Sequence, residues 1–295
     1  MIIGKCWKLT LEGKMAIILD GTALAKAIKK DIKTQVEKMA TPPGLAVIIV
    51  GDDSASHVYV KNKKKDCQIC GIVSYEYSLP KETGQDNLLA LIDELNQNPN
   101  IHGILVQSPL PTGYNEQEVF QRISPKKDVD AFHVNSAGGI LRGEYSFLPC
   151  TPAGVISLLD HYEIDLVGKH CVVVGHSNIV GKPMALMLLN RDATVTVCHI
   201  HTKDLSSHTR QADILISAVG KKINLITADM VKPGVVIVDV GINYKEDGKI
   251  CGDVDFDAIS KKASYISPVP GGVGPMTRAM LMQNTLQSAQ NHSKT

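Results

Sequence analysis

The sequence predicts an α/β protein of two domains, in which one domain interrupts the other in sequence and a cleft lies between them. Two observations support this fold class. Short apolar segments typical of buried parallel strands alternate with amphipathic helical segments along the chain. Near the end, residues 268–275 pack three prolines and three glycines into eight positions. This pattern predicts a shaped loop, after which a helical segment can return to the first domain.

Six apolar segments are expected to be strands, in chain order 45–50, 103–107, 171–175, 194–198, 213–219 and 235–241. Helical periodicity lies between them, for example at 23–39, 85–97, 152–161 and 179–190. Alternating strands and helices predict βαβ units and a parallel sheet covered on both faces. Two prolines near 147–152 indicate a boundary. The expected division is residues 15–150 with 276–295, residues 151–275, and an N-terminal extension at 1–14.

Composition excludes several classes of protein. The 295 residues are 44% hydrophobic and 21% charged, with a formal charge of +1. This near-neutral balance favours neither nucleic acid nor an anionic membrane as partner. No apolar run approaches the roughly 20 residues that span a bilayer, and the N-terminus lacks a secretory signal. We therefore expect a cytoplasmic protein with a small-molecule substrate.

The seven cysteines are odd in number and scattered, which argues against a disulfide framework. Cys67 and Cys70 form a single CxxC motif. They are spaced i, i+3 near the end of an expected helix, and no second CxxC or suitably spaced histidine completes four zinc ligands. We expect packed thiols and no metal site.

Residues 170–189 have the pattern of a strand, a glycine turn and a helix. Gly175 ends the strand, Ser177 can cap the helix, and Gly181 lies in its first turns. The spacing G-x-S-x-x-x-G differs from G-x-G-x-x-G, but its place in a βαβ unit suits a pyrophosphate at the helix N-terminus. We therefore predict a Rossmann-like NAD(P)-binding domain in the second segment.

The end of the next strand bears on the choice of cofactor. Sites that select NAD usually carry an acid there to hold a ribose hydroxyl. Here residues 199–203 are His, Ile, His, Thr and Lys. This neutral-to-basic segment contains no acid, so it tolerates the 2′-phosphate of NADP. The expected cofactor is NADP. The alternative is that these histidines only cap a surface turn.

A lysine-rich helix follows the first strand, within 51–71, and Gly71 is expected to end it. On this helix Ser56, Tyr59 and Lys63 are spaced i, i+3 and i+7 and share one face. Three more lysines surround Lys63 in sequence, namely Lys61, Lys64 and Lys65.

Neighbouring positive charge and partial burial both lower the pKa of a lysine from its ordinary value of about 10.4. Lys63 is therefore a candidate general base or proton shuttle, with the Tyr59 hydroxyl beside it. The alternative is a solvated basic stripe on an ordinary surface helix.

Two other segments supply polar groups to the same region. Gln107 places an amide at the end of a buried strand, before a turn with two prolines. Asp128 and Asp130 lie in a short expected loop. An amide and a carboxylate together can bind a heterocycle with N–H donors and a carbonyl, at the strand ends where open α/β sheets bind ligands.

These motifs together resemble the bifunctional methylenetetrahydrofolate dehydrogenase/cyclohydrolases, the FolD family. The matching segments run in the family's order over roughly residues 16 to 290: VGDDSASHVYVKNKKKDC, GILVQSPLP, KKDVDAF, PCTPAGV, VVVGHSNIVGKPMA, ADILISAVGK, VIVDVGIN and PVPGGVGPMT. The SxxYxxxK helix and PVPGGVGPMT are highly specific. The chain departs from the family pattern at His176, Ile200, the segment 136–140 and Ala131 of DVDA.

The resemblance implies roles for particular residues. The catalytic residues would be Lys63, Tyr59, Gln107 and Ser56. The substrate-binding residues would be Tyr59, Lys63, Val106, Gln107, Ser108, Asp130, Pro270, Gly271 and Gly274. The NADP-binding residues would be Gly175, His176, Ser177, Ile179, Ile200, His201 and Ile242.

The resemblance also implies a reaction and an assembly. NADP would take a hydride from 5,10-methylenetetrahydrofolate, water would convert the 5,10-methenyl product to 10-formyltetrahydrofolate, and the enzyme would be a homodimer. Three alternatives remain. One is another two-domain dehydrogenase with a shikimate-like or amino-acid substrate. The others are a folate-binding protein without turnover and a nucleic-acid-binding role for residues 61–65.

Overall fold

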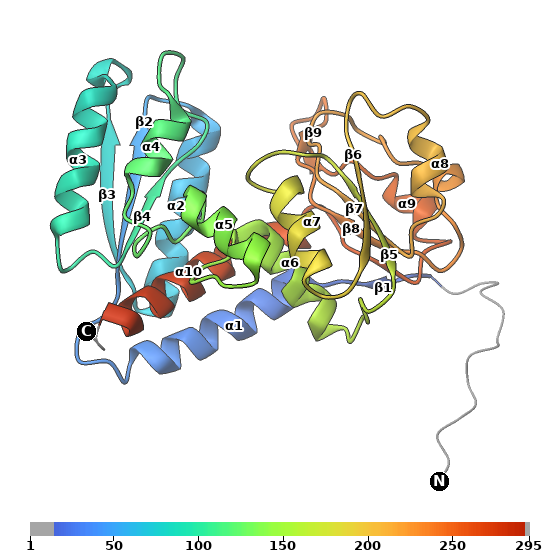
Figure 1. The fold of residues 1–295 in the computed structure, drawn as a ribbon, viewed down its shortest axis with the longest axis horizontal. Helices are drawn as coiled ribbons and strands as arrows, with labels where there is room; N and C mark the ends of the chain where they lie inside the picture. Colours follow the sequence, from blue (N-terminus) through green and yellow to red (C-terminus); the bar gives the residue numbers. More distant parts are fainter. Residues whose placement is uncertain (1–14, 293–295) are drawn as a thin grey trace, which may run out of the picture.

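The chain folds around two parallel β-sheets, one in each lobe of Figure 1. The structure is a computed structural model that describes residues 15–292, and of residues 54–58 it describes the backbone alone. The smaller sheet has the order β3-β2-β4 and the larger the order β1-β11-β8-β7-β5-β6. Every pairing in both sheets is parallel, as the sequence predicts.

All six predicted strands are present. The smaller sheet consists of β2 (Gly44–Val50), β3 (Val73–Leu79) and β4 (Gly103–Val106). The larger sheet consists of β1 (Ile17–Ile18), β5 (His170–Val174), β6 (Thr194–Cys198), β7 (Ile214–Ser217), β8 (Val236–Asp239) and β11 (Tyr265–Ile266). An antiparallel ribbon consists of β9 (Asn243–Tyr244) and β10 (Ile250–Cys251).

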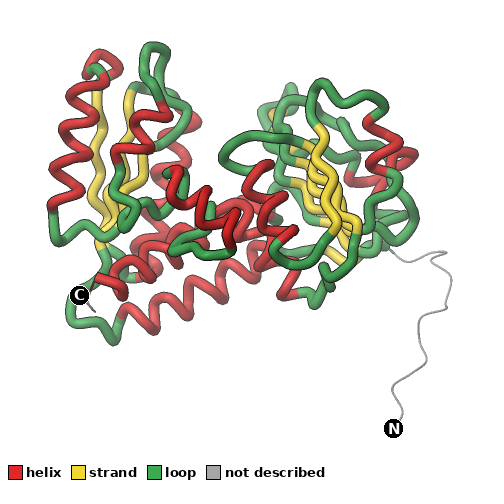
Figure 2. Tube along the Cα trace, viewed as in Figure 1, coloured by secondary structure: helices red, strands yellow, loops and turns green. Residues whose placement is uncertain are grey.

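Helices cover both faces of each sheet (Figure 2). One face of the smaller sheet packs on α1 (Gly21–Val36), α2 (Ser54–Cys70) and α10 (Val273–His292). Its other face packs on α3 (Gln85–Gln97) and α4 (Glu116–Arg122). The larger sheet packs on α6 (Cys150–His161) and α7 (Gly181–Leu189), with α5 (Val134–Arg142) beside them, and on α8 (Leu205–Thr209) and α9 (Phe256–Ile259) across the sheet. Two short 3₁₀ helices are η1 (Lys81–Thr83) and η2 (Ala228–Met230).

The central strand β2 shows why its sequence is continuously apolar. Its side chains alternate between the two faces. Val47 and Ile49 pack in the cluster with α1, α2 and α10, whereas Ala46 and Ile48 pack in the cluster with α3 and α4. All seven residues of β2 are buried, so neither face tolerates polar side chains.

The sequence analysis missed the strands that lack this pattern. β3 lies at the edge of the smaller sheet and carries partly exposed polar residues such as Ser74 and Glu76. β1, β9, β10 and β11 have two residues each, too few for any periodicity. β1 also pairs with β11 in the larger sheet, so residues before α1 contribute to the far lobe.

The segment 268–275 is only partly a loop. Residues 268–272 are irregular, but α10 begins at Val273 and includes Gly274 and Pro275 in its first turn. The prediction of a loop over the whole segment is therefore wrong for its last three residues. Proline is tolerated there because first-turn N–H groups need no partner within the helix.

Candidate active site

Lys63 lies on α2 with its amine at the carboxyl end of β4. Its Nζ donates a hydrogen bond of 2.9 Å to Oε1 of Gln107. Gln107 directly follows β4, and its backbone N–H donates to the Ile48 carbonyl at 2.8 Å. Its side-chain Nε2 donates to the carbonyl of Ser108 at 2.7 Å. The side-chain amide of Gln107 and the amine of Lys63, both predicted from the sequence, are thus in contact. The hydrogen bond to Ser108 fixes the other end of the amide.

Burial lowers the pKa of Lys63, and the nearby groups of Asp130, Cys150 and Cys67 oppose that shift. The residue as a whole is only partly buried, but its amine lies at the inner end of the side chain. The expected contribution of the neighbouring lysines is wrong, because adjacent helical positions point in other directions. Lys64, for example, pairs with Glu76 at 2.8 Å.

The two acids of the expected loop have different tasks. Asp128 is buried and accepts three hydrogen bonds that fix the loop, from Phe132 N (3.2 Å), His133 N (2.9 Å) and Ser136 Oγ (3.1 Å). Burial raises the pKa of Asp130, whereas the Lys63 charge and a hydrogen bond with the Cys150 thiol lower it. Asp130 is therefore the acid that faces the lysine.

Lys63 and Asp130 form a pair that can share a proton. Burial favours the neutral form of each group, and their mutual attraction favours the charged form of each. The net charge of the pair is the same in both arrangements. Such a pair suits proton transfer to and from a substrate bound beside it.

Sequence reasoning missed Cys150 and Asn284 as parts of this site. Cys150 begins α6, is 3% exposed, and contacts the carboxyl group of Asp130. Burial raises the pKa of its thiol well above the ordinary value, so it stays protonated. Asn284 of α10 donates to the carbonyls of Val129 (2.8 Å) and Leu148 (3.0 Å). Cys150 lies in the quoted PCTPAGV segment, but no local spacing shows that it meets Asp130.

Tyr59 lies one helical turn before Lys63 and is partly buried. Burial raises the pKa of its hydroxyl, as does Tyr244 of β9, whereas Arg278 of α10 lowers it. The phenol thus faces groups from both lobes, and the sequence did not single out Tyr244 or Arg278. Ser56 lies on the same helix, but its side chain is outside the described part of the structure.

Val106 and Ser108 flank Gln107 in different environments. Val106 is 3% exposed and packs in the core on the α3 side. The Ser108 hydroxyl donates to Oε1 of Glu116 at 2.8 Å. The contacts just given for Val106 and Ser108 do not involve Lys63. That these two residues touch the substrate stays a prediction.

The loop 268–272 packs against the start of α1. The N–H of Thr22 donates to the Gly271 carbonyl at 2.9 Å. A Cβ at Gly21 would lie only 1.8 Å from the Gly272 carbonyl oxygen. This close approach explains the glycine at position 21. Within the loop, Gly271 has φ +111°, and a Cβ at Gly272 would lie 2.6 Å from the Pro268 carbonyl oxygen. Pro270 within the loop and Gly274 in the first turn of α10 are exposed, and their part in binding substrate stays a prediction.

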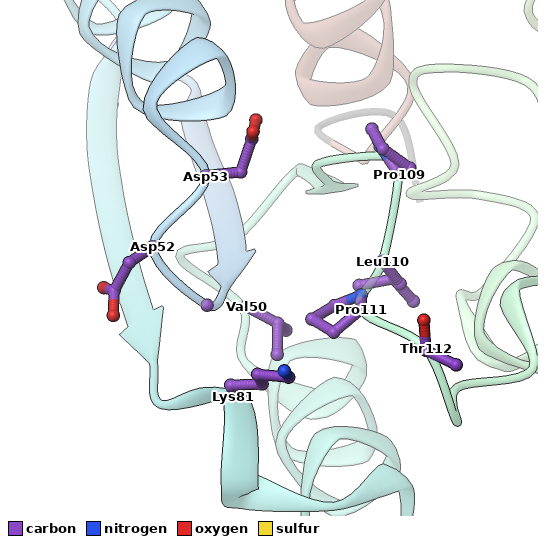
Figure 3. Close-up of a pocket in the computed structure, with 9 residues that line it drawn as sticks. Val50, Asp52, Asp53, Lys81, Pro109, Leu110, Pro111 and Thr112 are labelled. Carbon is purple, nitrogen blue, oxygen red and sulfur yellow. The ribbon is translucent and has the colours of Figure 1, made fainter.

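A pocket of about 370 Å³ opens at the carboxyl ends of β2 and β4. Figure 3 shows it between the loop that precedes α2 and the proline turn that follows Gln107. Its lining residues are Val50, Gly51, Asp52, Asp53, Lys81, Pro109, Leu110, Pro111 and Thr112. The pocket therefore lies at the edge of the sheet where the sequence predicts ligand binding.

The glycine turn after β5 has the shape of a phosphate cradle. Gly175 has φ +120°, and a Cβ there would lie 2.4 Å from the Ala218 carbonyl oxygen. A Cβ at Gly181 would lie 2.2 Å from the Gly175 carbonyl oxygen. The Ser177 hydroxyl accepts from the N–H groups of Val180 (3.2 Å) and Gly181 (3.4 Å). Ser177 therefore bonds to the first N–H group of α7 but is not its N-cap residue, which is Val180. The N–H groups of Gly181 and Lys182 at the start of α7 bond to Ser177, and Pro183 has no N–H, so an anion here would meet the backbone of the turn that precedes α7.

Three histidines gather beside this turn. The rings of His176 and His199 are 4.8 Å apart, and those of His199 and His201 are 5.9 Å apart. All three residues are exposed, and Ile200 among them is 89% exposed. Ile179 precedes α7, and Ile242 follows β8 at 38% exposure. The predicted cofactor residues therefore lie at one edge of the larger sheet, at the ends of β5, β6 and β8.

The CxxC cysteines are packed thiols, as expected. Cys67 contacts Met282 (Sγ–Sδ 3.7 Å), and Cys70 contacts the Lys29 carbonyl oxygen (3.8 Å). Burial raises the pKa of each thiol to about 12. Among residues 15–292 no group of three or more histidine, cysteine or acidic residues is arranged to hold a metal ion. None of the helices formed by these residues is long and apolar enough to cross a membrane.

A parallel sheet with a glycine cradle, next to a lobe with a buried lysine and acid, defines a two-domain nucleotide-dependent enzyme. Family comparison is more specific. Residues 19–130 match the catalytic domain of tetrahydrofolate dehydrogenase/cyclohydrolase, and residues 149–293 match its NAD(P)-binding domain. The chain belongs to the tetrahydrofolate dehydrogenase/cyclohydrolase family.

Similar proteins agree with this assignment. The bifunctional protein FolD of Nautilia profundicola is 54% identical over 94% of this chain and 98% of its own length. The FolD methylenetetrahydrofolate dehydrogenase/cyclohydrolase structure from Campylobacter jejuni is 55% identical, with a TM-score of 0.92 over 94% of this chain and 99% of its own. A Trypanosoma brucei FolD structure complexed with NADP and an inhibitor is 35% identical, with a TM-score of 0.91 over 96% and 100%. The predicted family, the two-domain α/β fold and the dehydrogenase and cyclohydrolase activities are confirmed.

Proposed function

We propose that the chain oxidises 5,10-methylenetetrahydrofolate to the 5,10-methenyl compound with NADP, and then hydrolyses that compound to 10-formyltetrahydrofolate. The observation that carries the proposal is the Lys63–Gln107 hydrogen bond beside Asp130, with the Lys63 pKa lowered by burial. The relatives' names support both activities, and the Trypanosoma complex supports NADP.

The residues present fit a dinucleotide. Gly175 and Gly181 keep the turn after β5 free of side chains, so a pyrophosphate can approach the backbone of this turn, whereas the first N–H groups of α7 are bonded to Ser177. When bound, NADP supplies the hydride acceptor for the oxidation step. The residues that would hold it are Gly175, His176, Ser177, Ile179, Ile200, His201 and Ile242.

The end of β6 favours NADP over NAD. The nearest acid that follows it, Asp204, accepts from the N–H of Ser207 and caps α8, so it is not placed as a ribose ligand. His176 and His201 offer imidazole N–H donors for a 2′-phosphate. His176→Ala should lower the ratio of kcat/KM with NADP to kcat/KM with NAD. Equal or better rates with NAD in the parent enzyme would refute the preference.

Hydrolysis depends on the buried polar groups. Water forms a bond to the methenyl carbon, and the neutral amine of Lys63 accepts the proton that the water loses. The bond from that carbon to N5 of the pterin then breaks, N5 takes up a proton, and the hydroxyl on the carbon loses its proton as the C=O bond forms, so that the carbon becomes the formyl group on N10. Gln107 keeps the Lys63 amine aimed at the reacting carbon, Asp130 binds the pterin ring, and Tyr59 packs on the substrate.

A spectrophotometric assay tests both steps. Methylenetetrahydrofolate is supplied with NADP or NAD, and the methenyl absorbance is followed with time. The proposal expects a rise in methenyl absorbance and then a decay, faster than the uncatalysed decay. Shikimate serves as the substrate for the competing dehydrogenase class. Turnover of shikimate without turnover of the folate would overturn the assignment.

The division of the chain is also a proposal. We assign residues 15–150 and 276–295 to the catalytic domain and 151–275 to the NADP-binding domain, with the exception that Ile17 and Ile18 of β1 complete the sheet of the NADP-binding domain. The family model for the NAD(P)-binding domain extends to 293. Contacts of α10 with the smaller lobe support this, for example Asn284 with Val129 and Ser288 with the His102 carbonyl. In hydrogen exchange under mild denaturant, the amides of α10 should lose protection together with those of β2. Loss together with β5 would contradict the division.

A homodimer and a cytoplasmic location complete the proposal. β6 is an edge strand of the larger sheet, with Leu189 and Val197 exposed beside it, and an edge of this kind can pair with a second copy. Sedimentation of the parent as a monomer would contradict the dimer. The six cysteines within residues 15–292 are free thiols, which suits a reducing compartment. Cell fractionation tests the location.

A further inference from the structure

A buried carboxylate joins three helices. Asp66 of α2 has a side chain that is 3% exposed. Its Oδ1 lies 2.6 Å from Lys29 Nζ of α1, and its Oδ2 lies 2.9 Å from Arg278 Nη1 of α10. One negative charge therefore stands between two positive charges. The cluster keeps a net positive charge in a largely buried place, where an unbalanced charge is costly.

The two cations of this cluster differ in exposure. The Lys29 side chain is 12% exposed and the Arg278 side chain is 26% exposed. Arginine carries five N–H donors in a planar fork, and among the described residues Arg278 makes no second ion pair. Asp66 thus lies against one end of the guanidinium as an ion pair, without the geometry of a hydrogen bond, and leaves the N–H donors of Arg278 for another anion.

The position of Arg278 links the cluster to the active site. Tyr59, Lys63 and Asp66 are spaced i, i+4 and i+7 on α2 and form one stripe. Arg278 contacts the last residue of this stripe, and its charge also acts on the hydroxyl of the first. It lies one helical turn after Gly274, at the end of α10 that follows the loop 268–272. The guanidinium therefore borders the surface that Tyr59 presents to substrate.

We propose that Arg278 is a specificity-determining residue that binds a carboxylate of the glutamate on the folate substrate. This inference rests on the proposed function, because a folate joins a pterin through a p-aminobenzoyl group to glutamate. With the pterin at Lys63 and Asp130 and the aromatic segment on Tyr59, the carboxylates are the part of the substrate that a guanidinium beside Tyr59 recognises. The charge of Asp66 keeps the guanidinium of Arg278 close to α2 before the substrate arrives.

The test compares substrates with and without glutamate in the whole enzyme. Arg278→Gln should raise KM for methylenetetrahydrofolate about tenfold, which is the size of one lost charge-assisted hydrogen bond. Its kcat should change little, because the contact is the same in ground and transition states. KM for the matching methylenetetrahydropteroate, which lacks glutamate, should not change. An equal rise for both substrates, or no rise for either, would overturn the proposal.

Lys29→Gln is the matched control, because it removes the other cation from Asp66. It should leave the ratio of the two KM values as in the parent, and a selective loss for the glutamate substrate would overturn the assignment to Arg278. Calorimetric titration with tetrahydrofolate and tetrahydropteroate gives the same comparison as Kd values. It therefore tests Arg278 independently of turnover, so a failure of the proposed reaction is distinguished from a failure of this inference.

Discussion

The two halves of the active site use different parts of the polypeptide. Around Lys63 the groups that matter are side chains, partly or fully buried and joined by hydrogen bonds to Gln107 and Cys150. Around Gly175 the site is made of backbone segments packed too closely for a Cβ, and the side chains beside it, such as His176, are exposed. The catalytic half should therefore depend on the identity of a few side chains. The nucleotide half should depend on the absence of side chains.

Lys63→Met should give the largest effect and tests the catalytic side of the comparison. Removal of the proton-transfer group should slow methenyl hydrolysis about 100- to 10,000-fold, while dinucleotide binding stays near the parent value because the glycine cradle is untouched. The decay of methenyl absorbance and a nucleotide titration measure the two effects. Lys64→Met, which removes the exposed partner of Glu76, is the control. Unchanged hydrolysis in Lys63→Met would remove this lysine from the mechanism.

Asp239 tests whether the nucleotide half also depends on a buried side chain. It ends β8, is 3% exposed, and accepts from the N–H groups of Gly241, Asp253 and Val254. Burial, more than the neighbouring Asp253 charge, raises the pKa of Asp239 from 3.8 to about 6. The folded state thus holds this proton more tightly than the unfolded state. The contribution of Asp239 to the free energy of unfolding should be fully present below about pH 4. It should be lost as the pH rises through about 6, a change of about 3 kcal/mol in all.

Asp239→Asn should flatten this part of the stability curve, measured as the parent-minus-variant difference in urea unfolding at several pH values. Asp247→Asn is the control, because Asp247 is exposed and hydrogen bonds from Lys249 lower its pKa. Its contribution has the opposite sign and is lost as the pH falls below the ordinary value. A flat difference curve for Asp239→Asn would show that this carboxyl does not titrate in the window.

Gly175→Ala tests the nucleotide side directly. The added Cβ meets the Ala218 carbonyl at 2.4 Å with φ at +120°, so the turn should be destabilised by about 1–3 kcal/mol and NADP binding should weaken. Gly138→Ala in α5 has open space at its Cβ and helical backbone. It should instead gain about 0.5–1 kcal/mol. If Gly175→Ala binds NADP like the parent, the nucleotide half does not require a residue without a side chain at this position.

Ala131→Gly should give the smallest effect. Ala131 has φ +59° directly after Asp130, a left-handed conformation that costs about 1–2 kcal/mol for a residue with a Cβ. Glycine should remove this strain at some cost in entropy, so a net gain of up to about 1 kcal/mol is expected, with hydrolysis unchanged. Ala137→Gly in α5 should lose about 1 kcal/mol. Thermal unfolding of both variants measures the contrast, and a loss in Ala131→Gly would contradict the strain.

Sequence alone predicted the parts of this molecule that have a local signature. The spacing of Tyr59 and Lys63, the amide at the end of β4 and the glycine turn after β5 each follow from short segments, and the structure has them in these places. Local spacing did not separate Asp130 from Asp128, and only the family resemblance singled out Asp130, because which acid is saturated by backbone N–H groups depends on how the loop closes.

Other features depend on contacts between distant segments. Cys150, Tyr244 and Arg278 reach the site from α6, β9 and α10, and no periodicity links them to α2. The low pKa of Lys63 was predicted, but half of its stated cause was wrong, since burial acts and the adjacent lysines point elsewhere. β3 was missed because an edge strand needs fewer apolar residues than a central one.

The edge strand β1 limits how this architecture can be rearranged. Ile17 and Ile18 pair with Tyr265 and Ile266 in the larger sheet, and the chain then begins α1 toward the other lobe. A contiguous gene segment that encodes the larger sheet from β5 to β11 would leave this outermost strand behind. The nucleotide-binding half therefore cannot be transferred to another protein as one contiguous segment. A chimaeric enzyme that borrows it has to carry the residues around Ile17 and Ile18 as well, or supply another strand to close the same border.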